Sequence, residues 1–316
     1  MQYKRRKVVV IGAGSVGTTY IYAMLHTGLA GEIVLIDIDT KRVEGEVMDL
    51  EHGLSFVQPV TIRGGDYSDC SDAHLIVVTA GAKQKAGESR LDLIQRNAEI
   101  IKAICEQIKK SGDSSAVMIM VANPVDTLTQ IAQKALGWPR QRVIGSGTVL
   151  DSARFRFMLS RHCGIDPRNI HAYILGEHGD SEVPAWSLTH VAGTPIREYC
   201  LICRKCDASI EHDKIARRVR DSAYHIIDYK GSTFYAIGLA LTRISGAVLR
   251  NEHSILTVSL LLEGEYDIDN VSLSVPCIVG ESGIERIITA PLSNQEQKAL
   301  KASGQELKKV FDKIKI

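Results

Sequence analysis

Over the first 145 residues, two patterns of hydrophobic and polar positions follow each other in turn along the chain. Short, unbroken apolar runs predict strands that are buried on both faces of a sheet. Longer stretches with apolar residues three and four positions apart predict helices. The predicted strands are Val8–Ile11, Ile33–Asp37, Leu75–Thr79 and Val117–Val121, and the predicted helices are Val16–Leu29, Lys41–Leu50 and Asp92–Lys109. Strands that alternate with helices predict a parallel sheet with right-handed crossovers.

The pattern changes after about residue 145. Long helical patterns now dominate, and two apolar runs follow each other as antiparallel strands do. The predicted helices are Val149–Cys163, Ser209–Tyr229, Phe234–Leu249 and a closing amphipathic helix Gln295–Ile316; the predicted strands are Ile170–Leu175, Ser254–Leu261 and Val271–Val279. We therefore expect an α/β fold, a Rossmann-type doubly wound parallel sheet followed by an α+β substrate domain. The expected domains are residues 1–145 and 146–316, with the active site where they meet.

Composition narrows the class of protein. Of 316 residues, 45% are hydrophobic and 24% charged, and the net charge of +1 argues against a nucleic-acid binder with a basic surface. No apolar run reaches the length that a membrane helix needs, and Gly12 interrupts the first apolar run too early for a signal peptide. Seven cysteines, an odd number, suit reduced thiols better than a disulfide framework. We expect a cytoplasmic protein.

A glycine-rich turn follows the first predicted strand. Gly12, Gly14 and Gly17 form the pattern G-x-G-x-x-G and open a predicted helix, which is the context that a dinucleotide site requires. Gly12 permits the tight turn, Gly14 lets a pyrophosphate approach the backbone, and Gly17 lets helix and strand pack closely. Asp37 ends the second strand 20 residues after Gly17. Its carboxylate would accept hydrogen bonds from ribose hydroxyls and repel a 2′-phosphate, which favours NAD over NADP.

Four polar segments carry side chains suited to hydride-transfer chemistry. His178, in a turn between glycines, is a natural proton donor because its pKa lies near neutrality. Asp151 would accept a hydrogen bond from the far ring nitrogen and favour the imidazolium. Arg154 lies on the same helical face as Asp151 and can grip a carboxylate with two hydrogen bonds. Arg90, in a polar loop, could polarise the keto oxygen when the loop closes.

These segments, in order and spacing, closely resemble the L-lactate dehydrogenases of the lactate/malate dehydrogenase superfamily. The residues that carry the resemblance are Gly81–Arg90, Asn123–Asp126, Leu150–Arg156 and Gly176–Asp180, together with the glycine fingerprint. The resemblance implies reversible hydride transfer between NADH and pyruvate, giving L-lactate, in a homotetramer. It makes Asn123 a ligand of both the nicotinamide side and the substrate oxygen. It also implies cofactor contacts by Val16, Arg42, Gly81 and Ala82.

Gln84 is the residue that we expect to determine the choice between pyruvate and oxaloacetate as substrate. The malate-specific relatives carry an arginine at this loop position, which pairs with the second carboxylate of oxaloacetate, whereas neutral Gln84 suits the methyl group of pyruvate. Thr233 matches the small polar residue that flanks the substrate pocket in lactate dehydrogenases. The neighbouring sequence departs from the commoner family pattern, because Ser232 replaces a usual tyrosine and Tyr235 a usual tryptophan.

Arg156 and His171 are two further basic residues that we expect to form a regulatory site. Arg156 lies two residues after Arg154, so the two side chains point about 200° apart around a helix. Bacterial lactate dehydrogenases that fructose 1,6-bisphosphate activates carry an arginine and a histidine at the positions of Arg156 and His171. The resemblance therefore implies an allosteric anion site at a subunit interface. The alternative is an ordinary surface ion pair for Arg156 and a structural His171.

Several alternatives stay open from the sequence. A malate dehydrogenase of the same fold, or a non-catalytic protein that binds NAD, would share the glycine fingerprint. Cys200, Cys203 and Cys206 have the spacing C-x-x-C-x-x-C, which can bind a metal, but reduced thiols are the preferred interpretation and no metal is expected. The apolar stripe of Lys41–Leu50 suits either a subunit contact or packing on the chain's own sheet.

Overall fold

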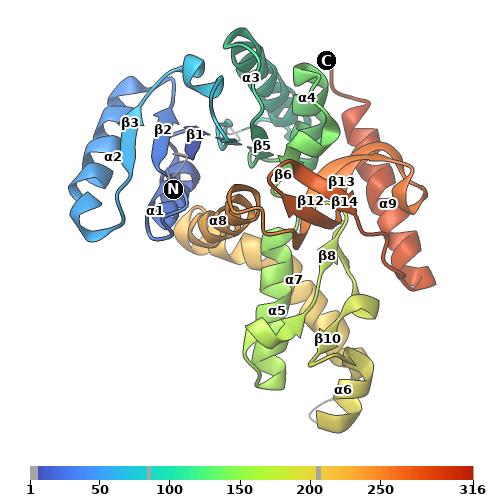
Figure 1. Ribbon diagram of the computed structural model, residues 1–316. Coiled ribbons are helices and arrows are strands. Elements are labelled where there is room, and N and C mark those ends of the chain that lie inside the picture. Colours follow the sequence, from blue (N-terminus) through green and yellow to red (C-terminus); the bar gives the residue numbers. More distant parts are fainter. Residues whose placement is uncertain (1–5, 84–86, 204–207, 316) are drawn as a thin grey trace.

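The computed structural model describes residues 6–83, 87–203 and 208–315. One nine-stranded sheet runs through the molecule, in the order β14-β13-β12-β6-β5-β4-β1-β2-β3 (Figure 1). Its strands are β1 Lys7–Ile11, β2 Glu32–Ile36, β3 Thr61–Gly64, β4 Leu75–Val78, β5 Val117–Met120, β6 Val143–Gly145, β12 Ser254–Glu263, β13 Asp269–Gly280 and β14 Gly283–Ile287. β1 to β6 are parallel, and β12 to β14 are antiparallel to their neighbours.

Helices cover both faces of the parallel strands. Alternate residues of each strand point to opposite faces, so Val8 and Val10 of β1 pack in one core cluster, and Val9 and Ile11 in another. The first cluster includes residues of α1 Ser15–Leu25, α2 Thr40–His52 and α8 Tyr235–Leu249; the second includes residues of α3 Arg90–Lys110 and α4 Val125–Leu136. The predicted doubly wound α/β class is confirmed.

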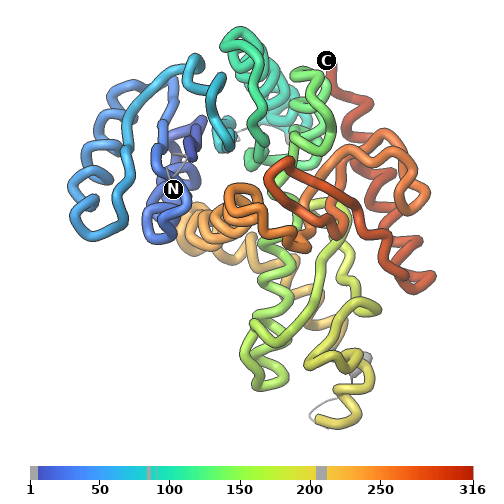
Figure 2. Tube along the Cα trace, viewed as in Figure 1, coloured from blue at the N-terminus to red at the C-terminus, as the bar shows by residue number. Residues whose placement is uncertain are grey.

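A smaller lobe extends from the sheet between β6 and α8. In Figure 2 the chain leaves the sheet in green, forms the yellow lobe and returns in orange. Its elements are α5 Val149–Cys163, β7 Ile170–His171, β8 Ile174–Leu175, β9 Val183–Pro184, β10 His190–Val191, β11 Thr194–Pro195, α6 Ile196–Cys203 and α7 Ala208–Lys230. A third core cluster around Phe155 and Ile170 holds this lobe together. The closing helix is α9 Asn294–Phe311.

Short 3-10 turns connect several elements: η1 Leu54–Phe56, η2 Tyr67–Cys70, η3 Arg140–Arg142, η4 Pro167–Asn169, η5 Trp186–Leu188 and η6 Glu265–Asp267. No helix in the described ranges combines the length and the apolar character that crossing a membrane requires.

The apolar stripe of α2 packs within its own chain, since Val43 and Val47 are buried in the first core cluster. Packing on the chain's own sheet therefore accounts for these two residues.

α1 and α8 are fastened together although they lie far apart in the sequence. The Tyr20 hydroxyl of α1 shares a buried hydrogen bond of 2.7 Å with the Ser245 hydroxyl of α8. Gly238 of α8 lies so close to Thr19 that a β-carbon at this position would come within 2.9 Å of the threonine methyl group. The first helix of the nucleotide-binding half and a helix of the second half thus pack as one unit.

Three expectations from the sequence need correction. The helix predicted over Val16–Leu29 ends at Leu25, because the Thr27 hydroxyl caps the Met24 carbonyl and Gly28 has a φ of +62°. The strand predicted over Ile170–Leu175 is two short strands, because β7 pairs with β10 while β8 pairs with β9. The closing helix ends at Phe311. The two late strands that the sequence predicted are present as β12 and β13, and they extend the main sheet through the pairing of Ser259 with Gly145.

Candidate active site

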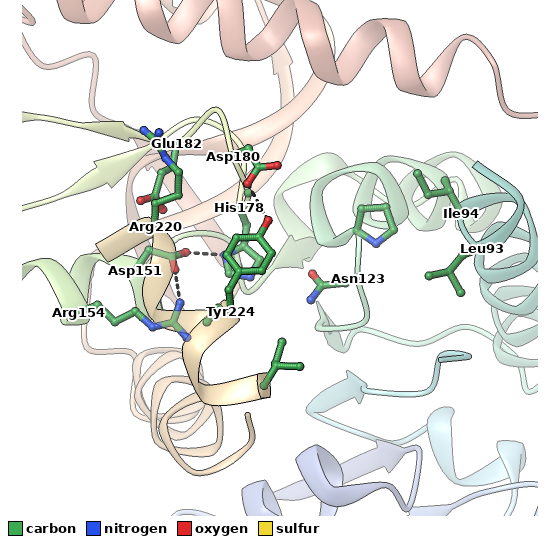
Figure 3. Close-up of a pocket in the computed structure, with 14 residues that line it drawn as sticks. Leu93, Ile94, Asn123, Asp151, Arg154, His178, Asp180, Glu182, Arg220 and Tyr224 are labelled. Atoms are coloured by element: carbon green, nitrogen blue, oxygen red, sulfur yellow. Dashed lines mark hydrogen bonds and ion pairs between the residues drawn. The ribbon is translucent and has the colours of Figure 1, made fainter. Parts of the chain in front are cut away.

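A pocket of about 380 Å³ opens where the two halves of the chain meet. The carboxyl ends of the parallel strands face it, which is where open α/β sheets bind ligands. Figure 3 shows His178, Asp151 and Arg154 on one side of the pocket and Asn123, Leu93 and Ile94 on the other. The lining residues come from α3, the loop after β5, α5, the turn between β8 and β9, and α7.

Three of the predicted site residues are linked directly. Nδ1 of His178 lies 2.5 Å from Oδ2 of Asp151, and Nη1 of Arg154 donates to Oδ1 of the same carboxylate at 2.7 Å. Asp151 and Arg154 are neighbours on α5 because they are three residues apart. The Asp151 side chain is 3% exposed, whereas that of His178 is 25% exposed. The ring therefore reaches the pocket while its partner stays behind it.

This pairing sets the charge of the histidine. Burial alone would lower the pKa of His178, but the charge and hydrogen bond of Asp151, helped by Asp126, outweigh it and raise the pKa to about 9. Burial opposes ionisation of Asp151, yet His178 and Arg154 hold its pKa below the usual value. At neutral pH the site therefore holds an imidazolium beside a carboxylate, which is a charged proton donor in a partly dry pocket.

Asp126 supports the histidine turn from behind. Its carboxylate accepts the His178 backbone N–H at 2.8 Å, and it is 1% exposed. Burial raises the pKa of Asp126 to about 6, although Ser259 and the His178 backbone N–H act in the opposite direction. Asp126 belongs to a segment that marked the family resemblance, but sequence reasoning gave it no role. Its helix, α4, begins right after Asn123 and Pro124, and only the fold brings it under His178.

The glycine turn has the shape of a nucleotide cradle. Gly12 has a φ of +116°, and a β-carbon there would lie 2.6 Å from the Ala80 nitrogen. A β-carbon on Gly17 would lie 2.0 Å from the Gly12 carbonyl oxygen, whereas one on Gly14 would meet open space. α1 has no side-chain cap and no acidic residue in its first turn, so its N-terminal amides remain available to an anion.

Asp37 lies beside this cradle. Its carboxylate accepts the backbone N–H of Ala13 at 2.7 Å and that of Asp39 at 3.0 Å. It is partly exposed at the end of β2. The open turn, the uncapped helix and the carboxylate suit the pyrophosphate and ribose of NAD. Val16 is partly buried against the core, and Arg42 is exposed on α2, where its guanidinium lies 3.6 Å from Glu46.

Asn97 ties two nucleotide-side loops together, and sequence reasoning missed it. Its side chain accepts the Ala82 N–H at 2.7 Å and donates to the Asn123 carbonyl at 3.0 Å. It is 2% exposed on α3. Gly81 and Ala82 follow β4, and Asn123 follows β5, so the amide bridges the ends of adjacent strands. A polar residue within the apolar face of α3 was the available signal.

The remaining predicted residues fall in different places. Thr233 is partly buried just before α8 and does not line this pocket. Arg156 lies on α5, where its Nε donates to the Ser152 carbonyl at 3.2 Å, and His171 is exposed on β7 opposite His190. Gln84 and Cys206 lie outside the described residues, as does the side chain of Arg90, although its backbone begins α3.

Three pocket residues carried no signal in the sequence. Glu182 precedes β9, and Arg220 and Tyr224 lie on α7. The Tyr224 hydroxyl donates to Asp180 at 2.8 Å. These residues meet only because α7 packs beside α5 and the histidine turn, so no local spacing links them.

The described cysteines are free thiols, and Cys200 is buried on α6. Within the described ranges, no cluster of three or more histidine, cysteine or acidic side chains could hold a metal ion.

Comparisons with known proteins agree with this geometry. Residues 6–145 match the lactate/malate dehydrogenase NAD-binding domain, and residues 148–316 match the α/β C-terminal domain of the same family. The chain is 56% identical to L-lactate dehydrogenase of Treponema denticola, covering 99% of this chain and 100% of that protein. It is 51% identical to the Acetivibrio thermocellus L-lactate dehydrogenase, covering 98% of each.

Solved structures give the same result. The minor L-lactate dehydrogenase of Enterococcus mundtii in its ligand-bound form is 42% identical, with a TM-score of 0.96 and 99% of each chain covered. A lactate dehydrogenase from a Medee basin deep-sea metagenome is 45% identical, with a TM-score of 0.94 over 98% of each chain. Both halves of the sequence, the fold and the arrangement of the pocket lead to one conclusion: this chain belongs to the lactate/malate dehydrogenase family.

Proposed function

We propose that this chain is an NAD-dependent L-lactate dehydrogenase, which interconverts pyruvate and L-lactate. The observation that carries the proposal is the chain of contacts from His178 through Asp151 to Arg154 inside a pocket that lies, like the glycine cradle, at the carboxyl ends of the parallel strands. A proton donor and a carboxylate-binding group thus lie side by side where a 2-keto acid can meet a nicotinamide. The relatives that carry the name L-lactate dehydrogenase support the substrate.

The cofactor site is assigned to the cradle. Gly12, Gly14, Val16 and Gly17 with the N-terminus of α1 would hold the pyrophosphate, and Asp37 and Arg42 would face the adenosine side. Gly81, Ala82 and Asn123 would line the nicotinamide side. Bound NADH supplies a hydride to the keto carbon. The chain's own residues orient the substrate, exclude water and provide the proton.

The proton is assigned to His178. Its imidazolium donates from Nε2 to the keto oxygen as the alcohol forms, and Asp151 holds the ring through Nδ1 and stabilises the charge. In the reverse direction the neutral ring accepts the hydroxyl proton of lactate. Since the pKa of His178 is about 9, pyruvate reduction should decline above that pH, where the donor is lost.

The substrate's carboxylate is assigned to Arg154, which can offer it two parallel hydrogen bonds. Its side chain is 12% exposed and lines the pocket. From the sequence alone, Arg90 would polarise the keto oxygen, Gln84 would face the methyl group, and Thr233 would flank it. Arg90 lies six residues after Gln84 in the sequence, and closure of this segment over the substrate stays an expectation from the sequence.

The test is the consumption of NADH with pyruvate and with oxaloacetate in parallel. A lactate dehydrogenase oxidises NADH with pyruvate and forms L-lactate, which an enantiomer-specific assay identifies. A strong preference for oxaloacetate would instead make this protein a malate dehydrogenase. No turnover with either acid, while NADH still binds, would contradict the proposed function.

We also propose a cytoplasmic homotetramer that fructose 1,6-bisphosphate activates through Arg156 and His171. Burial lowers the pKa of Arg156; Tyr173 opposes this shift and the charge of Arg243 adds to it, so a bound anion would stabilise the charged form of this half-buried guanidinium. A pyruvate titration with and without the bisphosphate, repeated in Arg156→Ala and His171→Ala, tests it. Activation in the parent that both variants lose supports the site; identical parent curves with and without the effector contradict it.

A further inference from the structure

Glu182 is a buried carboxylate that the assigned reaction does not use. It stands at the end of the histidine turn, four residues after His178, and is 6% exposed. Its backbone N–H donates to the Gly179 carbonyl at 3.2 Å. Within the described part of the chain its Oε1 is buried without a hydrogen-bond partner. A carboxylate in such a place is costly, and it lines the active-site pocket.

Arg220 meets it from another element. The residue lies on α7, lines the same pocket and has its Nε buried without an acceptor among the described residues. Figure 3 shows the two side chains at the same end of the pocket, next to Asp151. Among the arginines around Glu182, the charge of Arg220 acts on it more strongly than that of Arg154. A buried acid and a half-buried cation thus share one wall of the pocket.

Among the described residues, the charged groups that act most strongly on Glu182 come from three parts of the chain. Asp151 and Arg154 approach from α5, His178 from its own turn and Arg220 from α7. α9 faces the turn with Ser303, a neutral hydroxyl that accepts the Glu177 N–H. Burial, followed by the charge of Asp151, raises the pKa of Glu182 to about 8, although His178 and the two arginines oppose the shift. The carboxyl therefore changes charge just above neutral pH.

We propose that Glu182 is a positioning residue whose charge determines how strongly Arg220 attracts an anionic substrate. This rests on the proposed function, because the substrate must be a carboxylate. When Glu182 is neutral, Arg220 attracts the carboxylate of a 2-keto acid toward Arg154. When Glu182 is ionised, it neutralises Arg220 and repels the incoming anion. Substrate binding therefore favours the protonated form of Glu182 and weakens as the pH rises.

Glu182→Gln tests the acid because glutamine keeps its shape and removes its charge. KM and kcat for pyruvate are measured at pH 6 and pH 9 with saturating NADH. Loss of the His178 proton raises KM at pH 9 in both proteins, but the ratio of KM at pH 9 to KM at pH 6 should be about 3- to 10-fold smaller in the variant. At pH 6 the two proteins should agree within about twofold in KM. Glu198→Gln, at an exposed position on α6, is the matched control and should keep the parent ratio.

Arg220→Met tests the cation. Its KM for pyruvate at pH 6 should rise about 3- to 10-fold with kcat within about twofold of the parent. Arg217→Met, at an exposed position on the same helix, should leave KM unchanged. NADH affinity, measured by fluorescence, checks that each variant is folded.

The outcomes separate the two proposals. If the parent does not reduce pyruvate, the proposed function fails. If the parent reduces pyruvate but Glu182→Gln keeps or enlarges its KM ratio, Glu182 does not have this role. An equal rise of KM in Arg220→Met and Arg217→Met would mean that only the overall charge of the protein matters, and would overturn the inference.

Discussion

At the scale of single residues, Asp151 has two partners at once. One oxygen meets His178 and the other meets Arg154. Arg154 uses only Nη1 in this contact, so its other N–H groups can still bind a substrate carboxylate with two hydrogen bonds. The carboxylate that keeps the histidine charged thus also orients the arginine, and the two roles can be separated by substitution.

Asp151→Asn should lower pyruvate reduction by a factor on the order of 10²–10⁴, the usual contribution of acid–base assistance. The amide cannot stabilise an imidazolium, so the pKa of His178 falls toward its ordinary value and the protonated donor becomes scarce near neutral pH. NADH affinity should stay unchanged, since Asp151 lies away from the glycine cradle. Steady-state kinetics with a pH profile measure the effect. Asp166→Asn, which removes an exposed carboxylate paired with Arg168, is the control, and equal kinetics in the two variants would contradict the role of Asp151.

Arg154→Lys should mainly weaken pyruvate binding. Lysine keeps the charge but cannot form two parallel hydrogen bonds, so the loss should be on the order of 1–3 kcal/mol, or about 5- to 150-fold in KM. Arg168→Lys makes the same exchange at a side chain that is 88% exposed and should change nothing. A KM for pyruvate that stays at the parent value would show that Arg154 does not bind the carboxylate.

At the scale of elements, strands and helices could be predicted from their apolar patterns. His178, Asp151 and Arg154 could be predicted as site residues because they lie within short motifs. Asp151 and Arg154 share one helical turn, so their contact follows from spacing. Asn97, Asp126 and Arg220 could not be found in this way, because each acts on a segment that is distant in the chain. Likewise, the division of Ile170–Leu175 into two strands depends on partners that follow later in the sequence.

Asn97→Ala should loosen the loops after β4 and β5. The substitution removes a buried amide that bonds the Ala82 N–H and the Asn123 carbonyl, which should cost about 1–3 kcal/mol of unfolding free energy. Because both loops face the proposed nicotinamide side, the Kd for NADH should also rise, about 10-fold if a comparable free energy is lost on binding. Gln95→Ala removes another α3 amide, which binds the backbone of Lys315 instead. It should lower stability without changing the Kd, and an unchanged Kd in Asn97→Ala would contradict the expected link.

At the scale of the whole molecule, a charged network stabilises the sheet at the end opposite the pocket. Lys7 of β1 is 7% exposed and binds Asp69 and Asp72, and Arg63 of β3 binds Asp69 and Glu32. The hydrogen bonds from Arg63 outweigh burial, and with Lys7 they hold the pKa of Asp69 well below its usual value. Because the folded pKa is depressed, this stabilisation is present above the unfolded pKa near 4 and is lost as the pH falls through the folded value.

Asp69→Asn should therefore lower the free energy of unfolding by about 2–4 kcal/mol at pH 7, since it leaves a buried lysine and an arginine without their shared partner. Urea denaturation at pH 7 measures the loss. Asp72→Asn removes the other acceptor of Lys7, but that side chain is 71% exposed, so its cost should stay below about 1 kcal/mol. Equal losses in the two variants would mean that burial of the network adds nothing.

The buried bond between Tyr20 and Ser245 has a consequence for how the enzyme can move. A hinge that opened the molecule between its two halves would have to separate α1 from α8, expose both hydroxyls and also part β6 from β12 within the sheet. A hinge opening between the two halves is therefore an unfavourable way to admit a substrate. We expect entry and release to use local motion of short segments around the pocket, and we expect neither half to fold as an independent module.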